Sequence, residues 1–372
     1  MLWESAWTKA APQVKRAKTE LYNHCPSYFY AFISDKLGMS VPAHLTVYNP
    51  LESMRFGPEY CFLCGAPTQP LVDFVPVFAE WLMHRYDLTD RSIQLLDQSV
   101  VTYKDLRIPC CSRCRTQYVE PLEAQAQATA ELGLEAWRTL PEKTLFLWLG
   151  KMFYGVLITE LLTELNPLVK PRYPLAENAK MFRRFHAFFQ TFQALRVPIV
   201  FEDFNPASLF VLEVDPREDL IPFEYDDDLT TMVFSIKLGN TVLMGCLADN
   251  GIIRDAMRRV VTDADRPLHP IQVAEFKARV YYGAYLFNVV PDYYARPVKT
   301  GADHLVYDTL IDDITSAVFN PWENAAYAQS LQEMWKRWQI SPAAIMRNPS
   351  LPLSFLYDEK GEPRVLEAYE AP

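Results

Sequence analysis

Two cysteine pairs constrain the fold of this chain more than any other feature. Cys61 and Cys64 form one CxxC motif, Cys111 and Cys114 form a second, and 46 residues separate the two motifs. A CxxC turn is short enough for both sulfurs to face one ion, and four thiolates complete a tetrahedron around Zn²⁺ with Zn–S distances of about 2.3 Å. The sequence therefore predicts a structural zinc site that joins two distant stretches of chain.

One further cysteine competes for the site. Cys110 directly precedes Cys111 and would form a CxxxC pair with Cys114. The CxxC spacing favours Cys111 as the ligand, and Cys110 stays open as a substitute.

Two other uses of the cysteines fit less well. A secreted disulfide framework usually follows an apolar signal region, whereas this chain opens with a basic segment and has an odd total of seven cysteines. A thioredoxin-like redox motif needs a single CxxC. We therefore expect a reducing, cytoplasmic setting, with Cys25 and Cys246 as free thiols.

Composition limits the classes of partner. The chain has 372 residues, of which 50% are hydrophobic, enough to bury one large core or two ordinary ones. Its net charge of −10 argues against a protein that coats nucleic acid over its whole surface, because phosphate binding depends on clustered Lys and Arg. Any contact with DNA or RNA is expected to be local.

A long apolar segment raises the question of a membrane. The stretch from Thr144 to Thr163 approaches the length of a membrane span, but Lys151 and Glu160 lie well inside it. A charge at the centre of a span costs roughly 2.5 to 3.5 kcal/mol even on lenient insertion scales. A buried core helix is the better prediction, and we expect no membrane partner.

The rest of the pattern indicates an α+β protein in three parts. We expect an N-terminal helical segment over 1–56, a four-cysteine zinc module over 57–124, and a larger domain of helices and antiparallel sheet over 125–372. Gly239-Asn240 is a two-residue hairpin signal between two apolar strands. The expected helices cover 123–140, 174–195, 271–290 and 326–340, the expected strands cover 207–214, 230–238 and 241–249, and a hairpin is expected over 354–368.

Residues 57–124 resemble the zinc-bearing branch of the HNH, or ββα-metal, endonuclease family. Members place a CxxC before the first strand, then an acid-His element, and a second CxxC near the end. Here CFLCG is followed by Asp73-Phe74-Val75-Pro76, and IPCCSRC leads into an expected helix. The resemblance implies an HNH-like zinc-knuckle module inserted between the N-terminal segment and the larger domain.

The chain departs from that family at the positions that carry its chemistry. The position of the histidine that activates water is Phe74, which cannot accept a proton, and the Asn that often follows the last cysteine is Arg115. Asp73 and His84 are the weak catalytic candidates that remain. His84 follows Glu80 by one helical turn, so the two side chains are neighbours, but such a pair is more typical of a polar helix surface. The resemblance thus implies a nuclease scaffold that has lost its general base.

Local positive charge surrounds the second cysteine pair. Lys104, Arg107, Arg113 and Arg115 are accompanied there by one acid, Asp105. Arginines on a rigid turn can bind phosphate, or they can neutralise the negative charge of four zinc thiolates. Both interpretations stay open on the sequence.

An acidic run provides a further candidate for cation binding. Glu218, Asp219, Glu224 and Asp226-Asp227-Asp228 could offer oxygens to a hard cation. A solvated loop before the strand over 230–238 is the more common structure for such a run.

Three functions remain compatible with the sequence. The first is a pseudo-nuclease that associates with DNA or RNA without cutting it, in a setting such as antiviral defence. The second is a scaffold subunit in which zinc is structural and the C-terminal domain binds a protein partner. The third is an active nuclease with an atypical site.

Overall fold

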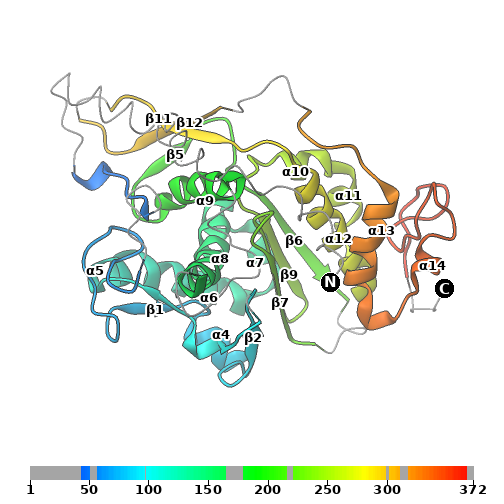
Figure 1. Ribbon diagram of the computed structural model, residues 1–372, viewed down its shortest axis with the longest axis horizontal. Coiled ribbons are helices and arrows are strands. Elements are labelled where there is room, and N and C mark those ends of the chain that lie inside the picture. Colours follow the sequence, from blue (N-terminus) through cyan, green and yellow to red (C-terminus); the bar gives the residue numbers. More distant parts are fainter. Residues whose placement is uncertain are drawn as a thin grey trace.

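The computed structural model describes residues 43–50, 57–96, 98–164, 179–215, 221–298, 301–310 and 317–366 (Figure 1). The basic N-terminal segment and Cys25 lie outside these residues. The described chain is a mixed helix and sheet protein, as the sequence predicts.

A five-stranded sheet forms the centre of the protein, with strand order β10-β6-β9-β8-β7. All neighbouring strands are antiparallel except β10 and β6. Gly239, at φ 63°, and Asn240 close the hairpin between β8 and β9, which confirms the predicted turn. The strands are β6 (Ser208–Val214), β7 (Phe223–Asp228), β8 (Val233–Leu238), β9 (Thr241–Cys246) and β10 (Pro267–Leu268).

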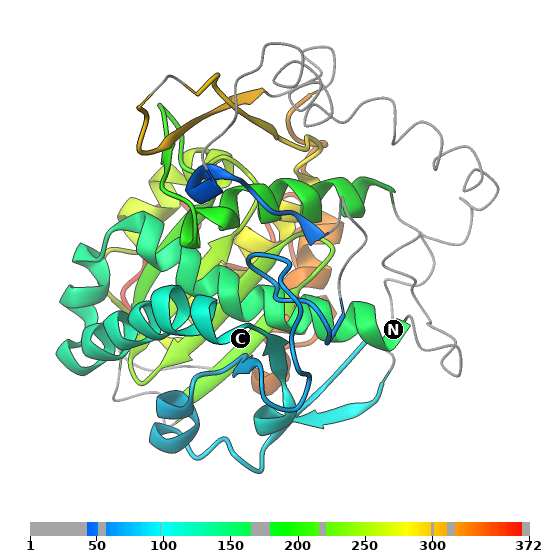
Figure 2. The ribbon, with the colours of Figure 1, turned by 90° about the vertical axis from the view of Figure 1, so that its left-hand side faces the viewer.

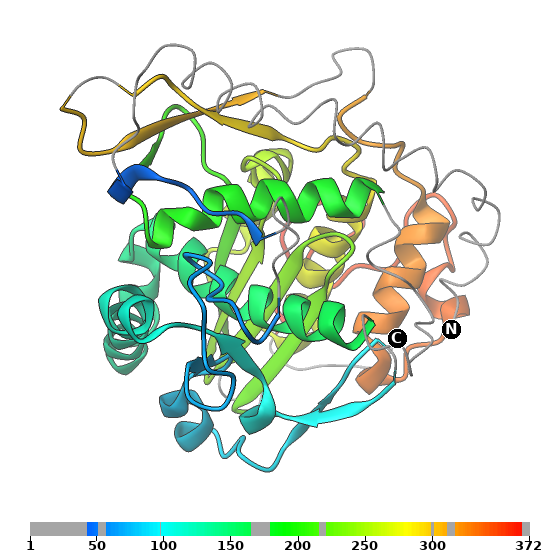
Figure 3. The same cartoon turned by 60° about the vertical axis from the view of Figure 1, so that its left-hand side comes forward.

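Both faces of this sheet are buried at its inner strands β6, β8 and β9, which are therefore mainly apolar, whereas the edge strand β7 is acidic. On β9, Leu243 joins the core on one face, whereas Val242 and Met244 join the core on the other. Helix α8 (Glu142–Glu164) contacts β6 and β9, and α12 (Pro270–Leu286) contacts β6 and β8. The sheet therefore lies between two layers of helices (Figure 3).

The predicted apolar helix is α8, and it is a core helix. Of its most apolar window, 89% is buried inside the protein. Gly133, at φ 90°, divides the helix expected over 123–140 into two. The other helices of this layer are α6 (Glu120–Leu132), α7 (Leu134–Thr139) and α9 (Ala179–Phe192), and a 3₁₀ turn over Gln193–Leu195 extends α9.

The opposite layer is built on α12. The carboxylate of Glu275, fully buried on α12, accepts hydrogen bonds from the backbone N–H groups of Phe355 and Leu356 and holds the C-terminal segment against the helix. That segment has one isolated bridge, Tyr357 to Pro363, in place of the expected hairpin strands. The remaining elements here are α10 (Ile252–Ala256), α11 (Arg258–Asp263), α13 (Asn324–Met334), a 3₁₀ turn over Lys336–Trp338 and α14 (Pro342–Ile345).

A smaller sheet lies at one end of the molecule, away from the hairpin of β2 (Ser92–Gln94) and β3 (Val100–Thr102) (Figure 2). Its strand order is β11-β12-β5, antiparallel between β11 and β12 and parallel between β12 and β5. The strands are β5 (Ile199–Phe201), β11 (Asp292–Ala295) and β12 (Leu305–Leu310).

The acidic run is an edge strand, so the predicted loop is wrong for its second half. Glu224 to Asp228 lie on β7, which pairs with β8 along its whole length. Asp228 caps the following turn by accepting hydrogen bonds from Thr230, and Asp226 forms an ion pair with Lys277 of α12. These partners account for Asp226 and Asp228, and Glu218 and Asp219 lie outside the described residues.

The cysteine-bearing region precedes α6 in the chain and packs against α8. Its first strand pairs with its last, β1 with β4, and a β2–β3 hairpin lies between them in sequence. One buried core includes residues of this region, of α8 and of the central sheet. The elements are a 3₁₀ turn over Ala43–Leu45, β1 (Phe74–Pro76), α4 (Glu80–Arg85), β2 (Ser92–Gln94), β3 (Val100–Thr102), a 3₁₀ turn over Tyr103–Asp105, β4 (Arg107–Pro109), α5 (Ser112–Cys114) and a π-helical turn over Arg115–Val119.

Candidate metal centre

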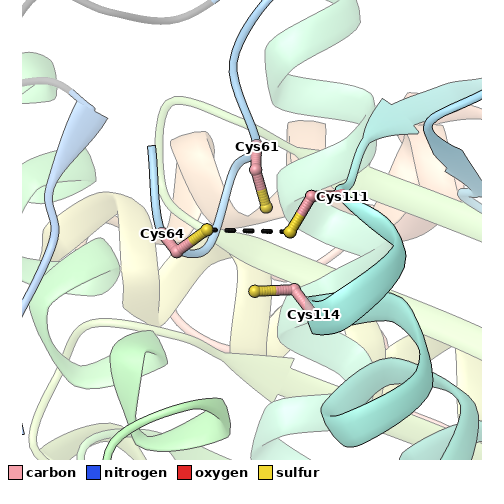
Figure 4. A group of neighbouring side chains, drawn as sticks. All are labelled: Cys61, Cys64, Cys111 and Cys114. Carbon is pink, nitrogen blue, oxygen red and sulfur yellow. Dashed lines mark hydrogen bonds between the residues drawn. The ribbon is translucent and has the colours of Figure 1, made fainter. Parts of the chain in front are cut away.

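Four cysteine side chains converge between a loop and the start of a helix. The sulfurs of Cys61, Cys64, Cys111 and Cys114 all lie within 4.8 Å of one another. Figure 4 shows the two pairs facing each other, with Cys64 Sγ 3.8 Å from Cys111 Sγ. Four thiols at this spacing can close around one metal ion.

The first pair is held in a tight turn by its own backbone. Gly65 N–H donates to the Cys61 carbonyl at 2.8 Å, and Cys61 N–H donates to the Ala66 carbonyl at 2.8 Å. Gly65 has φ 68°, and a Cβ there would meet the ring of Tyr48, with Cζ at 2.7 Å. The turn therefore needs glycine both for its backbone conformation and for space.

The second pair begins a helix. Cys111 is the N-cap residue of α5, and its carbonyl accepts a hydrogen bond from Arg115 N–H at 3.0 Å. Strands β1 and β4 place this helix start beside the first pair, because Phe62 N–H donates to the Pro109 carbonyl at 2.9 Å. This hydrogen bond to the end of β4 thus joins two cysteine pairs that are far apart in the sequence.

The fifth cysteine lies beside the group of four and outside it. Cys110 is fully buried, and its N–H donates to the Asp73 carbonyl at 3.0 Å. Hydrogen bonds from the thiols of Cys110, Cys114 and Cys64 lower the pKa of the Cys61 thiol, while the bond to Cys61 raises the pKa of Cys110. Cys110 therefore lies against the cluster without belonging to the group of four.

The four sulfurs differ in access to solvent. Cys61 and Cys114 are buried, with 0% and 2% of their surface exposed, whereas Cys64 and Cys111 are half-buried. One cysteine of each pair is thus nearer to solvent than its partner.

An aromatic stack fastens the first pair to the core. Phe62, between the two cysteines, stacks on Tyr154 of α8 with ring centroids 5.3 Å apart. The Leu63 carbonyl accepts a hydrogen bond from Arg196 Nε at 2.8 Å. The first pair is therefore held by α8 and by the residues that follow α9.

Sequence reasoning missed a buried ion pair beneath this region. Lys151 of α8 donates to Glu123 Oε1 of α6 at 2.6 Å and to the Val77 carbonyl at 2.7 Å. The other Glu123 oxygen accepts hydrogen bonds from the indoles of Trp81, at 3.3 Å, and Trp148, at 3.0 Å. A lysine inside the apolar 144–163 stretch indicates that a buried partner exists. The sequence does not identify this partner, because Glu123 lies 28 residues away on another helix.

The positions that the predicted HNH resemblance would assign to catalysis do not form a second metal group in the described part of the chain. Phe74 is half-buried on β1, and the Arg107 guanidinium lies over its ring at 4.2 Å. Asp73 accepts a hydrogen bond from Gln69 N–H at 3.0 Å, and His84 is exposed on α4. Among the described residues, the four cysteines are the one group of His, Cys, Asp or Glu side chains close enough to share a metal ion.

The four basic residues divide into two kinds. Lys104 pairs with Asp90 at 2.9 Å, and Arg115 lies 3.6 Å from Glu120. Arg107 and Arg113 are exposed and have no acidic partner among the described residues; Arg113 donates to Gln117 Oε1 at 3.3 Å. Two guanidinium groups near the cluster are thus available to an anion.

Comparison with known proteins gives no relative. No protein-family model, no curated protein and no solved structure matches the chain.

Proposed function

We propose that the four cysteines hold one structural Zn²⁺ and that the surrounding region binds nucleic acid without cleaving it. Four thiolates suit zinc, which is stable in tetrahedral sulfur coordination and closes the site when all four positions are filled by protein. A closed site leaves no position for water or substrate, so its role is to fix the two cysteine pairs relative to each other.

The loss of cleavage is supported by the contacts of Phe74. In an HNH-like module this position would carry the histidine that activates water. Here a phenylalanine lies under a guanidinium, and neither group accepts a proton from water. The knuckle, two paired strands and helix of this region agree with the order expected of that family, which is why we retain the resemblance as part of the proposal.

Binding to nucleic acid is supported by the two unpaired arginines. Arg107 and Arg113 are exposed near the cysteine pair that begins α5, and neither contacts a cysteine sulfur in the described structure. A guanidinium without an acidic partner can donate two parallel hydrogen bonds to a phosphate. This pair of free arginines is the observation that carries the proposal.

The proposal is tested by the salt dependence of binding to a labelled duplex. Each lost phosphate contact reduces the slope of log K against log salt by about 0.9, so replacing Arg107 and Arg113 by Ala should reduce it by about two units. We expect an affinity no tighter than roughly micromolar, because the chain carries a net charge of −10.

The matched control is Arg347→Ala, an exposed arginine beyond α14, at the far side of the molecule from α5 (Figure 1). It should leave the slope unchanged. Elemental analysis should give one zinc per chain, and the same duplex should stay intact in Mg²⁺ or Mn²⁺. Binding that does not depend on salt, or a double variant with the slope of the unmodified protein, would refute the role of these arginines.

A scaffold role is the second candidate, favoured by the pairing of Lys104 with Asp90 and of Arg115 with Glu120. Half of the predicted basic cluster is neutralised by acids in this way. In that case the larger domain would bind a protein partner, and the double arginine variant would leave complex formation intact. Either role suits the reducing cytoplasm, where the cysteines stay available to metal.

A further inference from the structure

The metal cluster contains one pair of sulfurs that differs from the others. Cys64 and Cys111 come from opposite cysteine pairs, their sulfurs are 3.8 Å apart, and both are half-buried. Their neighbours Cys61 and Cys114 are shielded from solvent. An oxidant that arrives from solvent therefore meets Cys64 or Cys111 first, with the other at contact distance (Figure 4).

We propose that Cys64 and Cys111 form an oxidation site, at which a hydroperoxide converts the two ligands into a disulfide and releases the metal. The identity of the metal rests on the proposed function, whereas the choice of the two cysteines rests on the distance between their sulfurs and on their exposure to solvent. The disulfide then takes over the role of the ion as the link between the first cysteine pair and the start of α5.

The chemistry proceeds in two steps. The thiolate of Cys64 or Cys111 attacks one peroxide oxygen, the O–O bond breaks, and a sulfenic acid forms while the second oxygen leaves as hydroxide or alkoxide and takes a proton from solvent to give water or an alcohol. The thiolate of the other cysteine attacks the sulfenic sulfur, an S–S bond forms, and hydroxide leaves and is protonated to water. The two sulfurs lose two electrons in total, which the peroxide accepts.

Metal release follows from the change in ligands. Cys61 and Cys114 remain as two sulfurs, and they take up protons when the ion departs, because two thiolates do not complete a zinc site. Cys110 stays reduced because it is fully buried. A dithiol reductant returns the pair to thiols and allows metal to bind again.

Trypsin separates the cysteines in a way that identifies the pair. Cleavage after arginine gives peptide 56–85 with Cys61 and Cys64, peptide 108–113 with Cys110 and Cys111, and the dipeptide 114–115 with Cys114. The full-length metal-bound protein is treated with equimolar hydrogen peroxide, the remaining thiols are alkylated, and the digest is analysed without reduction. Released metal is measured with a chromogenic chelator in the same sample.

We expect one cross-link, between 56–85 and 108–113, and one metal ion released per cross-link. Fragment ions should place the bond on Cys64, and Cys110→Ser should leave the cross-link unchanged. The variant Cys111→His keeps a zinc ligand but should give no cross-link, and Cys246→Ser serves as the control for a buried thiol away from the site.

Other products would overturn the inference. These are a bond within 56–85, a bond to 114–115, a bond that disappears in Cys110→Ser, or sulfinic acid without any cross-link. If the purified protein contains no metal, the proposed zinc site fails. The same peroxide treatment of the reduced chain then still decides whether Cys64 and Cys111 are the oxidation site.

Discussion

The buried ion pair between Lys151 and Glu123 gives the sharpest test of how the cysteine region is joined to the core. The Lys151 side chain is 1% exposed and that of Glu123 is 14% exposed, so neither charge is well solvated if its partner is removed. Glu123→Leu leaves the ammonium group with the Val77 carbonyl as its remaining acceptor and removes the acceptor of two indoles. We expect a large loss of stability.

The magnitudes follow from burial. Removing one partner of a buried pair costs about 3 to 5 kcal/mol, so Glu123→Leu should lower the free energy of unfolding by about 4 kcal/mol. Lys151→Met should cost less, about 2 kcal/mol, because Glu123 keeps its indole donors and some solvent. The double variant replaces the pair by apolar side chains and should recover about 2 to 3 kcal/mol of the summed cost.

The assay is urea unfolding of all four proteins, followed by tryptophan fluorescence and far-UV circular dichroism. The indoles lose their acceptor in both the single Glu123 variant and the double variant, so that loss cancels in the double-mutant cycle. Lys336→Met is the matched control, because its pair with Glu333 is exposed and should contribute little. Single costs that add to within about 0.5 kcal/mol would show that the two charges do not stabilise each other.

Two further predictions concern single positions. Gly155→Ala should lower the free energy of unfolding by about 1 to 3 kcal/mol in the same urea assay, because the new Cβ meets Val77 and lies 2.9 Å from Ile108 Cδ1. The control Gly283→Ala on α12, where the nearest atom to the new Cβ is 3.9 Å away, should be neutral or stabilising. Equal effects of the two substitutions would refute the packing argument. Burial raises the pKa of Asp249 to about 6, so its carboxyl binds a proton more tightly in the folded state. Asp249 should therefore lower the free energy of unfolding by about 1.4 kcal/mol per pH unit from about pH 4 to 6 and add no further change above that range. Burial also raises the pKa of Asp227 to about 7, so the quantity to measure is the difference in free energy of unfolding between the unmodified protein and Asp249→Asn, and a difference that stays constant from about pH 4 to 6 would refute this.

The sequence predicted the parts of the fold that depend on local rules. CxxC spacing identified the cysteines that converge, and Gly239-Asn240 identified the hairpin because a two-residue turn needs positive φ there. The apolar run over 144–163 predicted a helix that is buried on all sides, and Lys151 and Glu160 within it favoured the protein core over a membrane span.

The parts that it missed depend on partners far along the chain. Strand β7 carries five polar residues in six, and it is a strand because β8 supplies hydrogen bonds and Lys277 supplies a counter-charge to Asp226. In the sequence, Glu123 has the pattern of an ordinary acid on a helix surface, and its partner Lys151 comes from a different helix, α8. Neither the pairing of β7 nor the Glu123–Lys151 ion pair has a fixed spacing along the chain, so no sequence pattern predicts these contacts.

The fastening of the first cysteine pair by Arg196 has a consequence for synthesis of the chain. Cys111 is synthesised 47 residues after Cys64. Arg196, whose guanidinium donates a hydrogen bond to the Leu63 carbonyl, is synthesised 133 residues after Leu63. At about 5 to 20 residues per second, the first pair spends several seconds as an open dithiol turn before its last contact exists. If the four cysteines bind zinc as we propose, metal uptake by the nascent chain is separated in time from the packing that encloses the site, and during this interval the site is open to a chaperone or a competing metal.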